Sequence, residues 1–462
     1  MRTGISVAEA RALVLAAARP LAPEIVAFEA ALGRVLTEEV RSARTLPPAD
    51  CSAMDGYAVR AQDVAAAGAK LRVAYEVAAG GSAPRALAAG EAARIFTGAP
   101  IPPGSDTVVR QEDTEARAGE LRVLLAVPRG ESVRAAGEDV RAGELVLAAG
   151  VRIGPAEVGM LASLGKTLAH VHRRPNVAVL SGGDELVEPH EQPTHGRIVS
   201  SNAYTIAAQC REAGALPNNL GIARDTPGDL ERLLSAGLGA DVLVSSAGVS
   251  VGDHDHVRPT LEKLGVRLEF WGVEMKPGYP VTFGRADEGR GAFVFGLPGN
   301  PVSAMVTFEL FVRPLLLRLA GRSDLARPAI DAIAGERFSK KPGREHYLRV
   351  FLEKRGADGA AVARTTGSQS SGVLRSMTLA DGLLVFPADA SEIAAGARAR
   401  VLVLDDSFFA RAPTCAASRT SAQRCYWAAR RGAWGATRRG SSCAANPRRR
   451  SSRGCSRACS RT

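Results

Sequence analysis

N-V-A-V-L-S-G-G-D-E, residues 176–185, is the stretch of sequence that decides the fold. Its first half has the composition of a short buried strand, and its second half is a polar loop rich in glycine. The same pattern recurs at 241–246 and at 292–296, and segments with a helical pattern separate the three stretches. Because buried strands alternate with helices here, we predict a parallel sheet with helices on both faces.

Each of the three strands runs directly into a loop of glycine and polar residues. The loops read S-G-G-D-E (181–185), S-S-A-G-V-S-V-G-D-H-D (245–255) and G-L-P-G-N-P-V-S (296–303). Ligands of open α/β sheets bind beyond the carboxyl ends of the strands, where such loops meet. Backbone amides and hydroxyls can hold an oxyanion there, and carboxylates can hold Mg²⁺. The sequence therefore predicts a site for an anionic ligand at this edge of the sheet.

The candidate residues in these loops fall into two chemical groups. Backbone and hydroxyl groups that can contact an anionic ligand belong to Ser181, Gly182, Ser246, Gly248, Ser250, Pro298, Gly299, Asn300 and Pro301. Oxygen ligands for a metal belong to Glu185, Asp253 and Asp255. Helix caps and rigid strand-to-helix connections explain the same loops without a ligand, so both interpretations stay open. His254 and His256 stand beside acids, which is more typical of a polar loop face than of a zinc site.

Three further loops carry charged residues whose ordinary role is that of a solvated turn. P-P-A-D-C-S-A-M-D-G-Y-A-V-R holds Asp55 among proline and glycine. R-A-A-G-E-D ends in Asp139, and E-M-K-P-G-Y-P contains Lys276, a candidate point charge for phosphate. Loops held on a scaffold are also where chemistry tends to occur, so a functional role stays open for each.

Local patterns predict further helices and two β-rich regions. A capping box begins a helix predicted for 6–18, a second helix is predicted for 29–40, and a third begins with proline at 155–164. Short alternating runs broken by glycine and proline predict β structure at 47–150 and again at 328–404.

The basic charge of the chain is confined to its C-terminal end. The 462 residues carry a net charge of +11, which at first suggests a nucleic-acid partner. Residues 407–462 hold 13 Arg and no Lys, Asp or Glu, so without those 13 charges the value of +11 becomes −2. The body of the protein therefore gives no indication of specific nucleic-acid binding.

The same C-terminal segment, 407–462, has few aliphatic residues and no helical or strand period, which predicts disorder. It holds five of the seven cysteines, at spacings that give no paired C-x2-C metal ligands. Three explanations stay open: an arm that binds an anionic surface, a metal-binding segment, or a non-native reading frame. The last is favoured because the composition changes abruptly after Asp406.

Cysteine usage and hydropathy bear on where the protein is found. Outside the tail, the cysteines are Cys51 and Cys210, which fits a reducing cytosol and predicts a cytoplasmic protein. No run of about 18 apolar residues is present, so we expect no membrane partner. The apolar residues at 12–18 follow Glu9 and lack a cleavage pattern, which favours a helix over a signal peptide.

Together, these segments resemble the molybdopterin molybdenumtransferase family, the bacterial family related to the gephyrin E domain. The resemblance rests on eight segments in order: S-A-M-D-G-Y-A (52–58), R-I-F-T-G-A-P (94–100), G-E-D (137–139), S-G-G-D-E-L (181–186), S-S-A-G-V-S-V-G-D-H-D (245–255), K-P-G (276–278), G-L-P-G-N-P-V-S (296–303) and T-T-G-S-Q-S-S-G (365–372). Each segment alone is a weak signal, whereas their order and spacing together are specific. The tail lies outside the resemblance.

The resemblance implies an elongated homodimer of mixed α/β and β class with four domains per chain. These are a three-layer α/β domain that binds molybdopterin, a β-rich domain, a discontinuous linking domain and a C-terminal β-barrel. The predicted division of the chain is 1–46 for N-terminal helical pieces of the linking and α/β domains, 47–140 for the β-rich domain, 141–174 for the return of the linking domain, 175–326 for the α/β domain, 327–406 for the barrel and 407–462 for the tail.

The resemblance also implies an enzyme of molybdenum cofactor biosynthesis. It would insert molybdate into adenylylated molybdopterin and release AMP, with Mg²⁺ as its cation and an upstream molybdopterin adenylyltransferase as the source of its substrate. On the matching motifs, the catalytic residues would be Asp55, Thr97, Asp139, Lys276 and Ser371. Acidic residues beside a pyrophosphate and a molybdate dianion make sense only with an intervening cation or protons.

One position departs from the family pattern, and two other functions remain open. Tyr279 stands where the family commonly has a second lysine, so a positive charge is replaced by a hydroxyl donor. A molybdopterin adenylyltransferase would need only the α/β unit, and the two β-rich regions argue against it. A non-catalytic scaffold of the gephyrin E type need not keep metal ligands, and the acidic residues argue against it.

Overall fold

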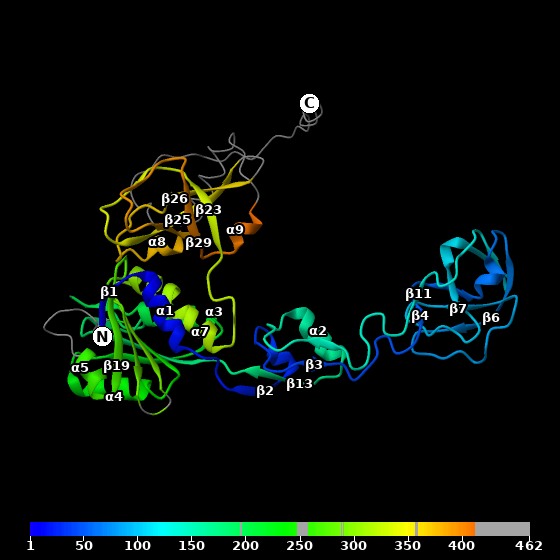
Figure 1. Ribbon diagram of the computed structural model, residues 1–462, viewed down its shortest axis with the longest axis horizontal. Helices are drawn as coiled ribbons and strands as arrows, with labels where there is room; N and C mark the ends of the chain where they lie inside the picture. The colour runs from blue at the N-terminus through cyan, green and yellow to red at the C-terminus, as the bar shows by residue number, and fades with distance from the viewer. Residues whose placement is uncertain (195, 247–256, 288, 290, 356–358, 412–462) are drawn as a thin grey trace, which may run out of the picture.

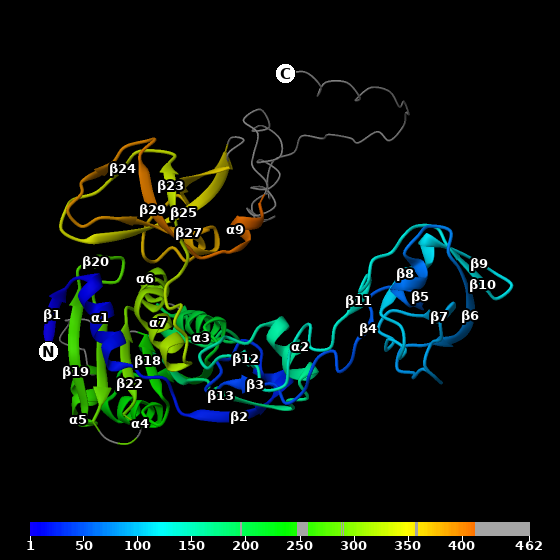
Figure 2. The ribbon, with the colours of Figure 1, turned by 45° about the vertical axis from the view of Figure 1, so that its right-hand side comes forward.

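The computed structural model describes residues 1–194, 196–246, 257–287, 289, 291–355 and 359–411. Over this part the molecule is elongated (Figures 1 and 2). An α/β domain and a β-barrel lie side by side at one end, a β-rich domain lies at the other, and a smaller linking cluster lies between them. The predicted fold class, α/β and β in several domains, is confirmed. The individual domain boundaries stay predictions.

The α/β domain is built on a seven-stranded sheet with the strand order β1-β19-β21-β22-β18-β14-β17. The strands are β1 (Arg2–Ile5), β14 (Asn176–Gly182), β17 (Leu216–Ala223), β18 (Val242–Ser246), β19 (Val266–Val273), β21 (Thr282–Ala286) and β22 (Phe293–Leu297). The neighbours among β17, β14, β18 and β22 are parallel, so the three polar loops do leave the same edge. The prediction of a parallel sheet is wrong at β21, which is antiparallel to both neighbours because its connections are too short for a crossover.

Helices cover both faces of this sheet (Figure 1). They are α1 (Val7–Ala17), α3 (Asn202–Glu212), α4 (Pro227–Gly237), α5 (Val257–Lys263), α6 (Pro301–Thr307) and α7 (Arg313–Leu319), with a π-helical turn (Phe308–Val312) joining the last two. α1, α3 and the α6–α7 helix share one core with the sheet, in which Val14, Ile206 and Phe311 are buried. α4 and α5 close the other face through Leu234 and Leu261. Each such buried side chain stabilises the domain by about 2 kcal/mol, so the sheet is a firm base for its loops.

Two predicted helix signals outside the sheet region are confirmed. Ser6 Oγ accepts a hydrogen bond from the Glu9 amide at 3.2 Å, and the Glu9 carboxylate accepts from the Ser6 amide at 3.0 Å, which is the capping box of α1. α2 (Pro155–Ser163) begins with its proline and stops before Gly165, whose φ of +71° ends the helix.

The helix predicted for 29–40 is wrong. Only a 3₁₀ turn (Phe28–Ala31) forms, and Gly33 then takes a φ of +79° that no helix accommodates. After this turn Leu36 forms a bridge with Val171, far along the chain. Pairing with a distant segment has therefore overridden the local helical pattern.

The linking cluster is assembled from two separate parts of the chain. Its ribbons are β2 (Pro23–Ala27) with β13 (Leu168–His172) and β3 (Val40–Arg41) with β12 (Leu145–Leu147). Leu36 packs with Leu161 in its core. Leu46 and Val140 exchange two backbone hydrogen bonds, of 2.7 and 3.1 Å, where the chain leaves the cluster and returns to it. Everything between these two residues forms a separate body at the far end of the molecule.

That body is the β-rich domain, whose main sheet has the order β8-β5-β7-β6-β10-β9. Its strands are β5 (Gly56–Val59), β6 (Lys70–Val77), β7 (Glu91–Ile95), β8 (Thr107–Arg110), β9 (Thr114–Arg117) and β10 (Glu120–Val123). A small pair of β4 (Cys51–Ser52) and β11 (Val133–Arg134) connects the sheet to the linking cluster (Figure 2). Val59 and Ile95 are buried in cores of this domain.

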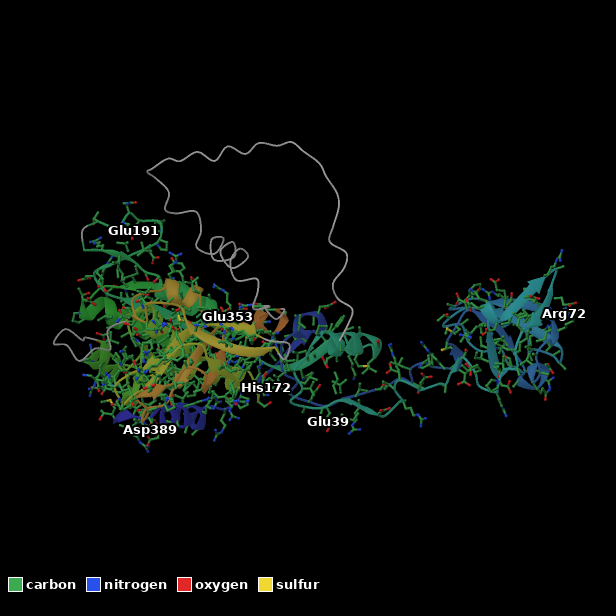
Figure 3. All side chains as sticks on the ribbon, turned by 90° about the horizontal axis from the view of Figure 1, so that it is seen from above. Glu39, Arg72, His172, Glu191, Glu353 and Asp389 are labelled. Carbon is green, nitrogen blue, oxygen red and sulfur yellow. The ribbon has the colours of Figure 1, made fainter. Side chains whose placement is uncertain are left out.

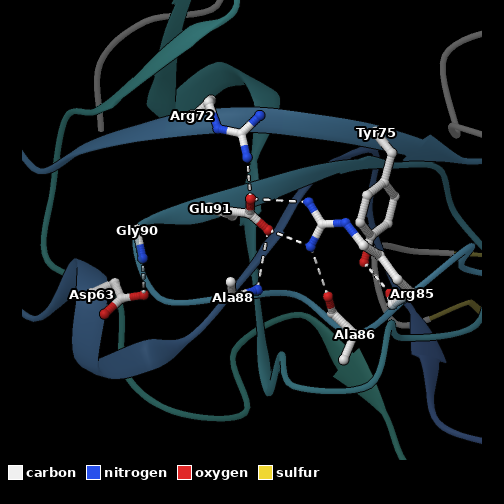
Figure 4. Close-up of polar contacts among 8 residues, drawn as sticks. All are labelled: Asp63, Arg72, Tyr75, Arg85, Ala86, Ala88, Gly90 and Glu91. Carbon is white, nitrogen blue, oxygen red and sulfur yellow. Dashed lines mark hydrogen bonds and ion pairs between the residues drawn. The ribbon is translucent and has the colours of Figure 1, made fainter.

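A buried carboxylate at the start of the central strand β7 holds several groups of this domain together (Figure 4). Glu91 is 6% exposed and accepts two hydrogen bonds from Arg85, at 2.7 and 2.9 Å, and one from the Ala88 amide at 3.1 Å. Arg72 contacts the same carboxylate from β6. The bonds from Arg85 and Ala88 lower the pKa of Glu91 from its ordinary 4.5 to about 2.

The C-terminal β-barrel closes on itself. Its strands are β23 (Ala329–Ala334), β25 (Glu345–Arg355), β26 (Ala360–Thr365), β27 (Gly382–Phe386) and β29 (Arg398–Val403). They follow the order β25-β26-β23-β29-β27, and β27 pairs again with β25. The short strand β20 (Met275–Lys276), which belongs to the loop between β19 and β21, also pairs with β25. The barrel is therefore docked directly on the α/β domain.

The prediction that the chain is disordered from Ser407 onward is wrong for its first residues. α9 (Ser407–Ala410) follows the last barrel strand, and its Phe408 is 3% exposed and packs in the barrel core. Arg411 binds the buried Asp381 carboxylate with a contact of 2.7 Å. The composition of the whole segment did not reveal these two contacts with the barrel, one apolar and one an ion pair. Residues 412–462 lie outside the described part of the chain.

Candidate functional site

A pocket of about 610 Å³ lies at the carboxyl ends of β14, β18 and β22. Its lining includes seven of the predicted residues: Gly182, Glu185, Ser246, Pro298, Gly299, Asn300 and Pro301. Gly372 of the barrel also contributes to the wall. The predicted site at the carboxyl edge of the sheet therefore exists as a cavity of the size that small-molecule ligands occupy.

A row of hydrogen-bonded hydroxyls forms the base of this region. Ser181 Oγ and Ser246 Oγ lie 3.2 Å apart at the ends of adjacent strands. Ser200 Oγ donates to Ser181 Oγ at 3.1 Å. All three side chains are buried, and Ser181 itself does not line the pocket. Ser181 thus supports the neighbouring Ser246, which reaches the cavity.

Glu185 is the one predicted metal ligand that the structure describes. Its carboxylate is exposed at the pocket and folds back over Gly183. Asp253 and Asp255 lie outside the described residues, as do Gly248 and Ser250. In the described part of the chain, no three His, Cys, Asp or Glu side chains come together as a metal site. Glu185 alone supplies one hard oxygen ligand, which suits Mg²⁺ but does not by itself hold it.

A loop of the barrel is pinned beside the pocket by a buried arginine. Arg349 of β25 is fully buried and donates to the Ser370 carbonyl at 3.1 Å, while its backbone amide donates to Gln369 Oε1 at 2.9 Å. The Ser371 carbonyl accepts from the Val302 amide of α6 at 3.1 Å. Burial lowers the pKa of Arg349 to about 10. The predicted residue Ser371 is therefore placed at the junction of barrel and α/β domain.

Lys276 does not line this pocket but a second one, of about 450 Å³, on the barrel side of the 274–280 loop. The second pocket is rich in cations: its lining is Glu274, Lys276, Ser339, Lys340, Lys341, Pro342, Gly343, Arg344 and His346. Glu274, its one acidic residue, is paired with Arg344 at 3.0 Å. The pocket therefore carries an excess of positive charge, which suits an oxyanion.

His346 adds a neutral group to this second pocket. Its ring is buried against β20, and Nε2 has no hydrogen-bond partner among the described residues. Burial, together with the cations Lys276, Arg349 and Lys340, lowers the pKa of His346 to about 4. At neutral pH the imidazole is therefore uncharged, and the positive charge of the pocket comes from lysine and arginine.

Asp55 and Thr97 form a third group, on the β-rich domain. Asp55 Oδ1 accepts from the Thr97 amide and from its hydroxyl, both at 2.8 Å. These two bonds, the amide first, lower the pKa of Asp55, so its exposed carboxylate is ionised. Asp139 lies where the same domain joins the linking cluster. Its amide donates to the Leu46 carbonyl at 3.0 Å, and its side chain is exposed.

Within one chain this third group is far from the two pockets. Figure 3 shows Arg72 of the β-rich domain at the opposite end of the molecule from Glu191 of the α/β domain and Asp389 of the barrel. Among the described residues, the structure thus brings the predicted ones together at two neighbouring pockets and, separately, on the β-rich domain, with Asp139 where that domain joins the linking cluster.

Comparison with known proteins decides the family. Family models match the chain in order: the MoeA N-terminal region (domain I and II) at residues 5–165, the probable molybdopterin binding domain at 178–318 and the MoeA C-terminal region (domain IV) at 331–404. The molybdopterin molybdenumtransferase of Nostoc sp. is 38% identical over 388 residues, which cover 82% of this chain and 88% of that protein. This chain belongs to the molybdopterin molybdenumtransferase family.

Other members agree with this assignment. Molybdopterin molybdenumtransferase 1 of Mycobacterium tuberculosis is 35% identical over 415 residues, covering 85% of this chain and 97% of that protein. The crystal structure of the molybdopterin biosynthesis protein MoeA from Pyrococcus horikosii superposes with a TM-score of 0.72 at 31% identity. It covers 87% of this chain and 99% of that chain. None of the described helices is both long enough and apolar enough to span a membrane.

Tyr279, the position that departs from the family pattern, packs between side chains of the α/β domain and the barrel. The Arg344 guanidinium lies 4.0 Å above the Tyr279 ring, and the ring packs edge-on against Trp271 with centroids 5.7 Å apart. Gly272 has a φ of +78°, and a side chain there would meet the Tyr279 ring at 3.2 Å. A cation from the barrel therefore stands beside the position where the family pattern has lysine.

Several residues that line the pockets were not predicted as site residues from the sequence. They are Leu186, Ile198, Val199, Ser200, Ser201, Asn202, Pro280 and Gly372 in the first pocket, and Ser339, Lys340, Lys341, Pro342, Gly343, Arg344 and His346 in the second. Two signals were available in the sequence. K-K-P-G-R at 340–344 concentrates three cations in a turn, and Arg349 interrupts an apolar strand run. Leu186 and Gly372 lie in the matched segments 181–186 and 365–372, whereas the other first-pocket residues carry no such signal, because only the fold brings them to the pocket.

Proposed function

We propose that this member of the molybdopterin molybdenumtransferase family inserts molybdate into molybdopterin that arrives adenylylated, and that it releases AMP. The observation that carries the proposal is the 610 Å³ pocket, which combines the predicted polar loops of three strands with a loop of the barrel. A site made from two domains is what an enzyme needs to hold a large substrate and exclude water. An upstream molybdopterin adenylyltransferase would supply the substrate.

In this proposal the first pocket binds molybdopterin. Ser246 and the Pro298–Asn300 turn present a hydroxyl and backbone groups, which contact phosphate oxygens without adding a fixed positive charge. Arg349 acts as a positioning residue, because it holds the barrel loop that carries Ser371 and Gly372. Loss of Arg349 would let that wall of the pocket move.

The second pocket is proposed to bind the oxyanions of the reaction. Lys276 is the predicted point charge, and Lys340, Lys341 and Arg344 surround the same space. The 274–280 loop contributes Lys276 to this pocket and Pro280 to the first, so the two cavities share a wall. Such an arrangement delivers molybdate beside the bound molybdopterin.

A divalent cation is part of the proposal. Glu185, together with Asp253 and Asp255, would hold Mg²⁺ at the first pocket, where it would neutralise the pyrophosphate and favour loss of AMP. The cytoplasmic location predicted from the cysteine usage also belongs to this proposal.

The enzyme is further proposed to act as a homodimer. Asp55 and Thr97 lie on the β-rich domain, which is at the opposite end of the molecule from the α/β domain and the barrel (Figures 1 and 3), and Asp139 lies where that domain joins the linking cluster. A two-fold related partner would bring this group to the pockets of the first chain. The ionised Asp55 would then serve as a proton acceptor or as a metal ligand in the partner's site.

The experiment that tests the proposal is a complete reaction with purified components. Protein, adenylylated molybdopterin, Mg²⁺ and molybdate should yield AMP and active molybdenum cofactor. Omission of Mg²⁺, with a chelator present, should abolish AMP release. AMP release no faster than in a protein-free control would contradict the proposal, and binding without turnover would favour the scaffold function.

A further inference from the structure

One wall of the first pocket is apolar, in contrast to its other walls. This wall is a ribbon of two short parallel strands, β15 (Leu186–Val187) and β16 (Ile198–Val199). Leu186, Ile198 and Val199 all line the cavity. Ile198 is 58% exposed and Val199 is 39% exposed, so both present apolar surface to solvent at the mouth of the pocket.

The ribbon is held in this exposed position from beneath and from the side. The Ser200 amide donates to the Val187 carbonyl at 2.9 Å, and the Ser200 hydroxyl donates to Ser181 at 3.1 Å. Tyr204 of α3 donates to the Glu188 carboxylate at 2.7 Å. Exposed apolar surface that is fixed in place carries an unfavourable hydration free energy, which a ligand lying on it would remove.

Asn202 supplies a polar group next to this apolar wall. It begins α3, lines the same pocket, and donates from Nδ2 to the Gly299 carbonyl at 2.7 Å. Its Oδ1 is buried and has no hydrogen-bond partner among the described residues. An unpaired buried acceptor is costly, and a donor group of a ligand would relieve it once the Asn202 side chain turns toward the cavity.

We infer that the β15–β16 ribbon is the platform on which the pterin ring system of the substrate lies. The inference rests on the proposed function and assigns one part of the substrate to one wall. The ring face covers Leu186 and Ile198, which pair across the ribbon and share one face, and the amino edge of the pterin lies beside Asn202. The phosphate end is then directed toward Ser246 and the Pro298–Asn300 turn, away from the apolar wall.

The chemistry of the two walls explains this orientation. The pyrimidine part of a pterin is flat and uncharged and has hydrogen-bonding groups along its edge, so apolar contact on its face and polar contact at its edge suit it. A phosphate or molybdate group on the same platform would lose its hydration without a partner. The platform therefore selects the ring system and not the charged groups.

The test is the binding of a pterin that carries no phosphate and no sulfur. 6-Hydroxymethylpterin, which is fluorescent, is titrated with the full-length protein, and binding is followed by fluorescence anisotropy. The wild-type protein should bind it, and Ile198→Ser and Asn202→Ala should each raise Kd about tenfold, which corresponds to about 1.4 kcal/mol.

The chain offers a matched control at Ile25. This residue is also 58% exposed and also lies on a short ribbon strand, but β2 is part of the linking cluster and not of the pocket. Ile25→Ser should leave the Kd for the pterin unchanged, and circular dichroism should show that all variants remain folded. Equal weakening by Ile25→Ser, unchanged binding by Ile198→Ser, or no binding to the wild-type protein would each overturn the inference.

The same titration separates this inference from the proposed function. Pterin binding that depends on Ile198 but is accompanied by no AMP release would leave the platform in place and remove the proposed activity. Normal AMP release with an unchanged KM in Ile198→Ser would keep the activity and remove the platform.

Discussion

Glu91 shows at the scale of one residue how a charge can be buried at the start of a central strand. The carboxylate is buried and bonded by Arg85 and the Ala88 amide, and these bonds depress its pKa to about 2 (Figure 4). Because the folded-state pKa lies below the unfolded value, the ionised form stabilises the fold. That contribution is present in full above about pH 4.5 and is lost as the pH falls toward 2.

We therefore expect Glu91→Gln to lower the melting temperature at pH 7 but to lose most of that effect once the pH falls below 2. The amide keeps the shape of the side chain but cannot pair as an anion with Arg85. The control is Glu120→Gln in the same domain, because Glu120 pairs with Lys70 at 3.0 Å on the surface, where both side chains are exposed. A pH-independent difference for Glu91→Gln would mean that packing, not charge, makes the contribution.

Asp55 is the residue whose chemical role can be tested most directly. Asp55→Asn preserves size and can still accept the hydrogen bonds from Thr97, so stability should change by less than about 0.5 kcal/mol. Turnover should fall by a factor on the order of 10² or more if the carboxylate accepts a proton or binds the metal. AMP release measures the loss, pterin binding should persist, and Asp63→Asn serves as the control. Full activity of Asp55→Asn would show that Asp55 has no catalytic role and that its loop is an ordinary solvated turn.

At the scale of single elements, the sequence predicted correctly those helices and strands that are determined by residues close together in the chain. Neighbours in sequence determine three such features: the capping box of α1, the three strands with their polar loops, and the helix that begins at the second proline of G-L-P-G-N-P. The failure at 29–40 has the opposite cause, since Leu36 pairs with Val171 across the linking cluster. The platform at Ile198 and the buried Arg349 also depend on contacts that only the folded chain creates.

α9 provides a prediction at this scale. Phe408 is buried in the barrel core, so Phe408→Ala should destabilise the protein by about 3 kcal/mol. Its neighbour Phe409 is 48% exposed, and Phe409→Ala should cost less than about 1 kcal/mol. Truncation after Asp406 should lower the melting temperature, whereas truncation after Arg411 should not. Urea unfolding of the four variants measures the effect, and a stable protein ending at Asp406 would show that α9 contributes nothing.

At the scale of the whole molecule, the proposed dimer can be tested by mixing variants. Asp55→Asn damages one end of the chain and Glu185→Gln the other, so each homodimer should be inactive. If the sites are shared between chains, co-expression forms mixed dimers in which one site is intact, and about a quarter of the wild-type activity should return. Asp55→Asn mixed with Thr97→Val damages the same end twice and should recover nothing. An absence of recovery in the first mixture would place each site within one chain.

The paired hydrogen bonds between Leu46 and Val140 have a consequence for how this architecture can be rebuilt. They have the geometry that closes a β-hairpin, so the whole β-rich domain occupies the place of a hairpin turn. Replacing residues 47–139 by Asn-Gly should yield a shortened chain that still folds and still binds pterin, while releasing no AMP. In genetic terms the domain behaves as a cassette, and one lineage could exchange it for another without disturbing the remainder of the protein.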